Sequence, residues 1–320
     1  MFRSGFFGTI RQQPDFNAAQ TAEELRNAMK GFGCDKAKVV HLLTRINNAQ
    51  RQMVSAEYTA LYGRELMKDL KSELSGDLEE LVLALMLSPG VYDSRRLHHA
   101  ISGMGTDEKV LIDVICTRSN RQLNAIKTAY RGQFGGSLES AVKWDTSGDF
   151  EQLLVALLQA KRDESNSANR GTARELAEKL YAAGEKRWGT DEDVFTSILV
   201  NESYAQLRLV FEEYNALYGH EIEEAIKGEF GGDAKNGFLT MIECIRSPPK
   251  FFARCLYESM KGLGTNDSEL IRVIVTRSEC DLALIRDEYP QQYGESLVDA
   301  IRGDTSGAYR DGLVAIVQGN

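Results

Sequence analysis

The stretch MKGLGT at residues 260–265 has three counterparts in the chain: MKGFGC at 29–34, ISGMGT at 101–106 and EKRWGT at 185–190. The second glycines of these four turns are separated by 72, 84 and 75 residues. They are Gly33, Gly105, Gly189 and Gly264. Self-similarity at a regular spacing indicates repeated structural units. Because 320 residues are also too many for one ordinary core, the sequence predicts an array of four repeats.

A carboxylate stands at a fixed distance from each turn. Forty residues after the second glycines lie Glu73, Asp145, Glu229 and Asp304. A single Gly-x-Gly-Thr turn before a helix is usually only an interhelix turn, and a single carboxylate before a glycine usually only ends a helix. Four turns with four carboxylates at one spacing favour a joint function, because a simple turn does not require a distant acid.

The segments between these markers have helical periodicity. After Gly76, one face of residues 76–86 carries Leu78, Leu81, Val82, Leu85 and Met86. Leu83 and Leu87 add apolar surface on other sides, so we expect this helix to be central in its unit. Strand-like alternation is absent, and the sequence therefore predicts an all-α protein with about five short helices in each repeat.

The residues after the turns resemble helix starts. We expect N-caps at Thr106, Thr190 and Thr265, followed by acids that the helix dipole favours in the first turn. The polar segment KRDESNSANRGTA is expected to be a connector that divides the chain into two pairs of repeats. The predicted organisation is a tail at 1–15, repeats at 16–88 and 89–160, the connector at 161–173, and repeats at 174–247 and 248–320.

Composition and charge restrict the classes of function. A net charge of −9 argues against direct attraction to nucleic acid or to anionic lipid, so contact with an acidic surface requires a bridging cation. Five cysteines without a CxxC spacing argue against a disulfide framework and a zinc site, and favour a reducing cytoplasm. The longest aliphatic run, residues 81–87, is too short for a membrane span, and MFRSGFFGTI lacks the apolar stretch of a signal peptide.

The glycine turns can bind a cation through backbone oxygens. Glycine lets a ligand approach the backbone closely, and two glycines in one turn allow several carbonyls to point at one place. Carbonyl and carboxylate oxygens without histidine or cysteine suit a hard cation, and Ca²⁺ accepts the irregular geometry that Mg²⁺ does not. One carboxylate leaves the bound calcium ion with a net positive charge, so an anion can complete its coordination shell. The sequence therefore predicts calcium as a bridge between an acidic protein and an acidic membrane.

The chain resembles the annexin family over residues 15–318. The resemblance rests on the Gly-x-Gly-Thr turns, on the acid 40 residues after each turn and on the four units of about 70 residues. The resemblance implies a curved disc of four five-helix domains. It also implies calcium sites on the convex face that dock reversibly onto anionic, phosphatidylserine-type membranes. The expected protein is cytoplasmic, is recruited to membranes by calcium, self-associates laterally there, and serves membrane organisation, trafficking or repair.

The resemblance also implies a set of ligands. Three carbonyls and one carboxylate would hold each ion: Met29, Gly31, Gly33 and Glu73; Ile101, Gly103, Gly105 and Asp145; Gly184, Arg187, Gly189 and Glu229; Met260, Gly262, Gly264 and Asp304. The implied lipid contacts are Thr106, Trp188, Thr190 and Thr265. The first repeat departs from the family pattern at Cys34 and Lys36, which we expect to weaken its helix cap and its lipid contact.

Trp188 at the tip of the third turn has two interpretations. Its indole either packs against its own turn or a neighbouring loop, or it turns outward with calcium into the lipid interface, where indole is favoured.

Two other classes of function remain. A helical scaffold for protein partners would use the N-terminal tail, where Phe2, Phe6 and Phe7 either form a docking patch or fold back on the protein. An enzyme is the least favoured class: GEKRWGT lacks the lysine of a phosphate-binding loop, and His220-Glu221 lacks the second histidine of HExxH. We expect the four histidines to lie on helix faces.

Overall fold

The computed structural model describes residues 7–31, 33–103 and 105–320. Within these ranges the chain forms twenty α-helices and no strand, which confirms the predicted all-α class of four five-helix repeats. None of the described helices combines the length and the apolar character needed to span a membrane.

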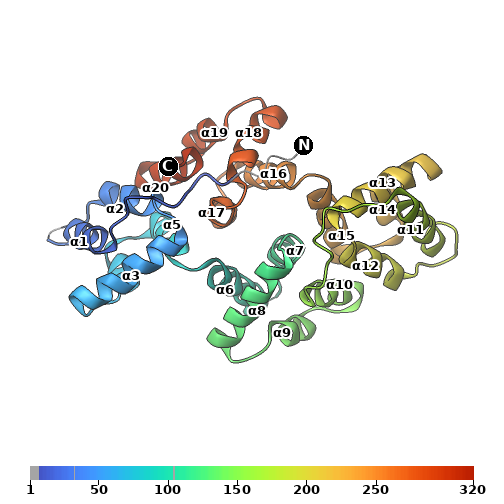
Figure 1. The fold of residues 1–320 in the computed structure, drawn as a ribbon, viewed down its shortest axis with the longest axis horizontal. Helices are drawn as coiled ribbons and strands as arrows, with labels where there is room; N and C mark the ends of the chain where they lie inside the picture. The colour runs from blue at the N-terminus through green and yellow to red at the C-terminus, as the bar shows by residue number, and fades with distance from the viewer. Residues whose placement is uncertain (1–6, 32, 104) are drawn as a thin grey trace. The chain divides into compact units, whose positions relative to one another are not determined.

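The chain divides into two compact units, and the first combines the first repeat with the fourth. From the first repeat it contains α1 (Ala18–Ala28), α2 (Lys36–Thr44), α3 (Asn48–Tyr62), α4 (Leu66–Glu73) and α5 (Gly76–Met86). The fourth repeat supplies α16 (Pro248–Met260), α17 (Asp267–Arg277), α18 (Leu282–Tyr293), α19 (Leu297–Asp304) and α20 (Gly307–Gln318). Helix α20 packs against α2 and α5, and α17 packs against α5 (Figure 1).

The second unit, Gly90–Pro248, combines the second and third repeats. The second repeat has α6 (Pro89–Ser102), α7 (Glu108–Ile115), α8 (Asn120–Phe134), α9 (Leu138–Asp145) and α10 (Gly148–Leu158). The third has α11 (Arg170–Ala183), α12 (Glu192–Asn201), α13 (Tyr204–Tyr218), α14 (Ile222–Glu229) and α15 (Gly232–Arg246). Helix α10 packs against α12 and α15, and α7 also packs against α15.

The polar connector does not separate the compact units. It lies inside the second unit, so the expected division into consecutive pairs of repeats is wrong for the packing. Helix α11 also begins at Arg170, inside the segment 161–173 that was expected to be a connector. The side chain of Asn169 starts this helix by accepting a hydrogen bond from the Thr172 amide at 2.9 Å.

The central position of α5 is confirmed, since its predicted apolar face is fully buried. Glycines allow neighbouring helices to approach this face and its counterpart in the second unit. A Cβ added at Gly312 in α20 would lie 2.8 Å from Leu81 Cδ2 in α5. In the other unit, a Cβ added at Gly237 in α15 would lie 2.8 Å from Leu153 Cδ2 in α10. The two units therefore use the same close helix contact.

A segment near the N-terminus joins the first repeat to the fourth. The amides of Thr9 and Ile10 donate to the Ser278 carbonyl at 2.7 and 3.0 Å, and the Thr9 hydroxyl donates to the Ile316 carbonyl at 2.6 Å. The Phe7 carbonyl accepts from the Ala283 amide, so the backbone at Phe7 lies along the fourth repeat. Phe2 and Phe6, which were expected either to form a docking patch or to fold back on the protein, are outside the described residues.

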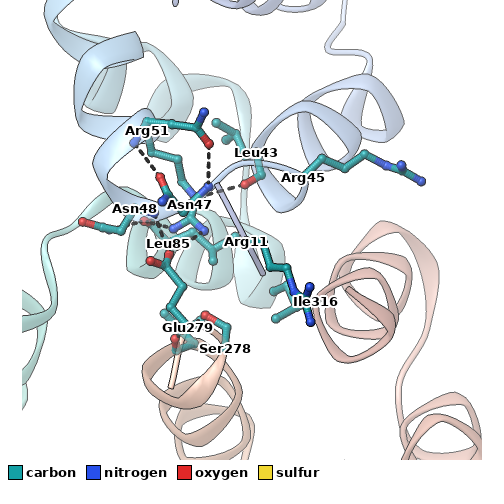
Figure 2. Close-up of polar contacts among 12 residues, drawn as sticks. Arg11, Leu43, Arg45, Asn47, Asn48, Arg51, Leu85, Ser278, Glu279 and Ile316 are labelled. Carbon is teal, nitrogen blue, oxygen red and sulfur yellow. Dashed lines mark hydrogen bonds and ion pairs between the residues drawn. The ribbon is translucent and has the colours of Figure 1, made fainter. Parts of the chain in front are cut away.

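A buried arginine holds the same junction together (Figure 2). Arg51 is 1% exposed, and its guanidinium donates to the carbonyls of Leu43 and Leu85, both at 3.0 Å. It also lies 3.4 Å from the Glu279 carboxylate, which accepts from the Asn48 amide at 2.6 Å. Burial lowers the pKa of Arg51 to about 10 and raises that of Glu279, while the ion pair opposes both shifts.

Replacing the buried arginine should destabilise the first unit. Arg51→Met removes its hydrogen bonds and leaves the Glu279 carboxylate without its counter-charge, and should lower the free energy of unfolding by about 2–4 kcal/mol. Arg45→Met is the matched control, because Arg45 is exposed and the same change there should alter stability by less than about 0.5 kcal/mol. Urea unfolding measures both, and equal midpoints for the two variants would contradict this role.

Candidate functional site

Each glycine turn is closed by one backbone hydrogen bond between the first two helices of its repeat. The amide after the turn donates to a carbonyl near the end of the first helix: Asp35 to Ala28 at 2.8 Å, Asp107 to Ala100 at 2.9 Å, Asp191 to Ala183 at 2.7 Å, and Asn266 to Ser259 at 2.7 Å. In each repeat this bond joins the end of the first helix to the start of the second.

Glycine is required in these loops by backbone geometry. In the fourth repeat, Gly262 and Gly264 have φ values of 112° and 88°, where a side chain would be strained. Glycines with positive φ recur in the other turns: Gly31, Gly33, Gly105 and Gly189. A Cβ at any of these six positions would meet no atom within 4 Å, so their backbone is open to a ligand.

The threonine after the turn contacts the distant carboxylate. Thr106 donates to Asp145 Oδ2 at 2.8 Å, and Thr265 donates to Asp304 Oδ2 at 2.5 Å. Thr190 donates to Glu229 in the same way. Every carboxylate of this set is the last residue of the fourth helix of its repeat. The predicted link between turn and acid is therefore a direct contact in the last three repeats.

The predicted threonine caps are wrong by one residue. The N-caps are Asp107, Asp191 and Asn266, whose side chains accept from the backbone of the first helical turn. The threonine hydroxyls are used by the carboxylates instead. Acids still occupy the first turn of each of these helices, as expected, and in the second and third repeats the cap itself is also an acid.

The third repeat brings the turn and its acid into the closest contact. A Cβ added at Gly184 would lie 3.1 Å from Glu229 Cγ and 3.2 Å from both Glu229 Cδ and Phe195 Cζ. The Gly184 carbonyl accepts from the Arg187 amide at 2.9 Å. The Arg187 side chain pairs with Asp191 at 3.3 Å. Only a glycine at 184 leaves room for the Glu229 side chain.

The first repeat keeps its helix cap, but its described residues lack the hydrogen bond between turn and acid that the other three repeats have. Asp35 caps α2 by accepting from the Lys38 amide at 2.9 Å, so the expected weakening of this cap by Cys34 is wrong. Among the described residues, no hydrogen bond joins Cys34 to Glu73. Burial, and then the nearby Glu73 charge, raise the pKa of the Cys34 thiol. The thiol thus lies near the acid without positioning it.

The remaining predicted ligands lie at helix ends. Met29 is the C-cap residue of α1, Ile101 lies in the last turn of α6, and Met260 ends α16. Gly103 lies beside its own turn, because a Cβ added there would be 3.7 Å from the Gly105 carbonyl oxygen. The structure thus brings turn and acid together, while the assignment of individual carbonyls as ligands stays a prediction.

Large apolar side chains stand at the tips of two turns. Trp188 is 103% exposed and Leu263 is 108% exposed, relative to the reference for each residue. The interpretation in which the Trp188 indole packs against its own turn or a neighbouring loop is therefore contradicted. Both tips are free to enter an apolar environment.

Two acidic pockets are lined by Asp304 and Asp145, and no sequence pattern indicated them because each combines residues from two repeats. In the first unit, Asp77, Asp267 and Asp304 line a pocket of about 380 Å³ together with Lys36. Burial raises the pKa of Asp267, and the charges of Asp77 and Asp304 raise it further. The hydrogen bond that Tyr309 donates to Asp267 lowers this pKa and so opposes the shift.

The pocket of the second unit has a volume of about 300 Å³ and is lined by the acids Glu108, Asp145, Asp149 and Asp233. Each pocket is thus lined by one turn-linked carboxylate, Asp304 or Asp145, and by the start of the fifth helix of the paired repeat.

A histidine contact beside the third turn was also missed. His220 precedes α14 and does not lie on a helix face, unlike the expectation for the four histidines. Its Nε2 lies 2.9 Å from Glu185 Oε2, which also accepts from the Tyr214 hydroxyl at 2.5 Å. Glu185 follows Gly184, so this contact anchors the start of the turn. The hydrogen bond that the imidazole donates to Glu185 raises the pKa of His220.

Comparison with known proteins shows four repeats of one family. A family model described as Annexin matches residues 20–85, 92–157, 175–241 and 251–316. Human annexin A13 is 46% identical over 302 residues, which are 94% of this chain and 96% of annexin A13. Human annexin A7 is 46% identical over 97% of this chain, and the chain spans 64% of the length of annexin A7.

Solved structures are similar over almost the whole chain. Annexin III has a TM-score of 0.96 and 42% identity, covering 99% of this chain and 98% of annexin III. A calcium-bound annexin (Sm)1 has a TM-score of 0.89 and 32% identity, covering 98% of this chain and 93% of that chain.

The close contact at Gly184 predicts opposite effects for two glycine substitutions. Gly184→Ala should lower stability by about 1–3 kcal/mol, because its Cβ would press on Glu229 and Phe195. Gly228→Ala, one residue before Glu229, should raise stability by up to about 1 kcal/mol, because the position is helical and open. Thermal unfolding measures both, and an equal or higher midpoint for Gly184→Ala would contradict the contact.

The His220 contact predicts a pH effect. Because the folded protein holds the pKa of His220 above its ordinary value, the contact contributes stability below that value and loses it as the pH rises through the raised pKa. An NMR titration should show the pKa falling toward the ordinary value in Glu185→Gln. The same pKa in both proteins would show that Glu185 does not hold the histidine.

Proposed function

Because this chain is a member of the annexin family, we propose that it binds anionic phospholipid membranes when calcium is present. The observation that carries the proposal is the contact between turn and acid. In three repeats a threonine hydroxyl holds a carboxylate oxygen against a loop of open backbone. This arrangement collects hydroxyl, carboxylate and backbone oxygens in each of these three repeats.

The donor set fits Ca²⁺. Carbonyl and carboxylate oxygens in an irregular loop suit this ion, which takes 6–8 oxygens at about 2.3–2.6 Å. In the fourth repeat the carbonyls of Met260, Gly262 and Gly264 would act with the Asp304 carboxylate. The carboxylate also ends a helix, where the dipole disfavours negative charge, and a cation there relieves this repulsion.

The ion would serve as a bridge to lipid. Three carbonyls and one carboxylate leave a calcium ion with a net positive charge and with coordination positions for a phosphate oxygen. The acidic pockets beside the carboxylates repel an anionic surface, so attraction depends on the bound cations. The exposed tips of Trp188 and Leu263 then enter the interface, where an indole is favoured.

The four sites should differ in strength. The second, third and fourth repeats have a hydroxyl that positions the acid, and the first has Cys34 instead, so the first site should fill last. The threonine hydroxyls that the sequence analysis assigned to lipid contact donate to the acids in this structure. We propose that Thr106, Thr190 and Thr265 act first in positioning the acids and contact lipid only through their remaining acceptor capacity.

The same proposal places the protein in the cytoplasm until calcium recruits it to a membrane. There it would serve membrane organisation, trafficking or repair, and it would associate laterally with further copies of itself. A protein partner at the N-terminal tail would add to this role.

Vesicle binding tests the proposal. The protein should sediment with phosphatidylserine-containing vesicles in calcium, and should stay in solution with a chelator or with vesicles of phosphatidylcholine alone. Sedimentation to the same extent with and without calcium would contradict a calcium bridge, as would the absence of sedimentation in both conditions.

Removing carboxylates should raise the calcium requirement. The double variant Asp145→Asn with Asp304→Asn should need about tenfold more calcium for half-maximal binding, because each change removes the only charged donor of a site. Asp299→Asn is the matched control, since Asp299 is exposed on the same helix as Asp304 and its loss changes the net charge equally per site. Equal shifts per substitution would attribute the effect to net charge and not to the sites.

A further inference from the structure

Trp144 is an almost fully exposed indole that the sites described above do not use. It is 92% exposed and is one of only two tryptophans in the chain. Its helix, α9, buries Leu138 and Val142 on the opposite side, so the indole is not displaced from a core position. A single exposed apolar residue is ordinary on a protein surface. The neighbourhood of Trp144 is what distinguishes it.

The indole stands next to a proposed calcium ligand. Trp144 directly precedes Asp145, whose carboxylate accepts from Thr106 at 2.8 Å. In the other repeats the residue before the carboxylate is small: Ser72, Gly228 and Gly303. A Cβ added at Gly228 or Gly303 would meet nothing within 4 Å, so this position is open to solvent in both repeats. Only the second repeat places a large apolar group there.

The surrounding charges select the kind of surface that can cover the indole. The next residue, Asp145, lines the acidic pocket of the second unit with Asp149, and the preceding Lys143 is paired with Glu139 at 3.0 Å. A surface that covers Trp144 must therefore also satisfy a cation held at Asp145. The interface of an anionic bilayer does both, because phosphate oxygens complete the ion and the headgroup region accepts an amphipathic ring.

We infer that Trp144 is a membrane anchor of the second repeat, inserting its indole into the headgroup region of an anionic bilayer when calcium occupies the adjacent site. The inference rests on the proposed function and adds a contact at the end of α9 to those of the turn tips. The second unit then carries two indole anchors, Trp144 and Trp188, on two different proposed calcium sites.

Depth-dependent quenching tests the anchor directly. Trp188→Phe leaves Trp144 as the only tryptophan, and its emission is measured on vesicles of phosphatidylserine and brominated phosphatidylcholine, at calcium concentrations where this variant is fully sedimented. Trp144 emission should shift to shorter wavelength and be quenched most by bromines close to the headgroups. The reciprocal Trp144→Ser variant, which copies the first repeat, should bind vesicles about fivefold more weakly than the wild type.

A transfer variant supplies the matched control. Gly303→Trp places an indole at the equivalent open position of the fourth repeat and should strengthen vesicle binding by a similar factor. Unquenched Trp144 emission on sedimented protein, or unchanged affinity in Trp144→Ser, would overturn the inference and leave the proposed function intact. Wild-type protein that does not sediment with calcium would contradict the proposed function itself, and the anchor with it.

Discussion

A hydrogen bond between a hydroxyl and a carboxylate 39 residues later is the constraint on which the rest of the site depends. It joins the start of the second helix of a repeat to the end of the fourth, as in Thr265 and Asp304. The three helices between them must return the chain to the same place, so their combined length cannot change. This accounts for the common spacing of turn and acid in the last three repeats, and the first repeat keeps the same spacing without this hydrogen bond in the part of it that the structure describes.

The pairing of repeats gives these contacts a common direction. The first repeat packs with the fourth and the second with the third, through glycines that admit a leucine at Gly312 and Gly237. In each unit one turn-linked carboxylate, Asp304 or Asp145, lines an acidic pocket together with acids of the paired repeat. Negative charge therefore gathers where the cations would bind. Under the proposed function, each unit meets an acidic membrane at this pocket only when the cations are present.

Much of the fold followed from the sequence, because repetition and helical period are local patterns. The face of α5 and the link between turn and acid could both be predicted from spacing alone. The caps could not: Thr106 and Asp107 are both good cap residues, and the choice depends on Asp145, which takes the threonine hydroxyl. The pairing of repeats was also hidden, since a long connector indicates flexibility of the chain and not which surfaces meet. The contact between His220 and Glu185 is tertiary, and no sequence pattern indicates it.

The position of bound calcium tests the account most directly. Crystals of the protein grown with calcium, measured at a wavelength where calcium scatters anomalously, should show a peak about 2.3–2.6 Å from the carbonyl oxygens of Gly262 and Gly264 and from the Asp304 carboxylate. Peaks of similar kind should occur at Asp145 and Glu229, and the weakest at Glu73. Anomalous peaks confined to the acidic pockets, with none at the glycine turns, would contradict the central claim that turn and acid together form the cation site.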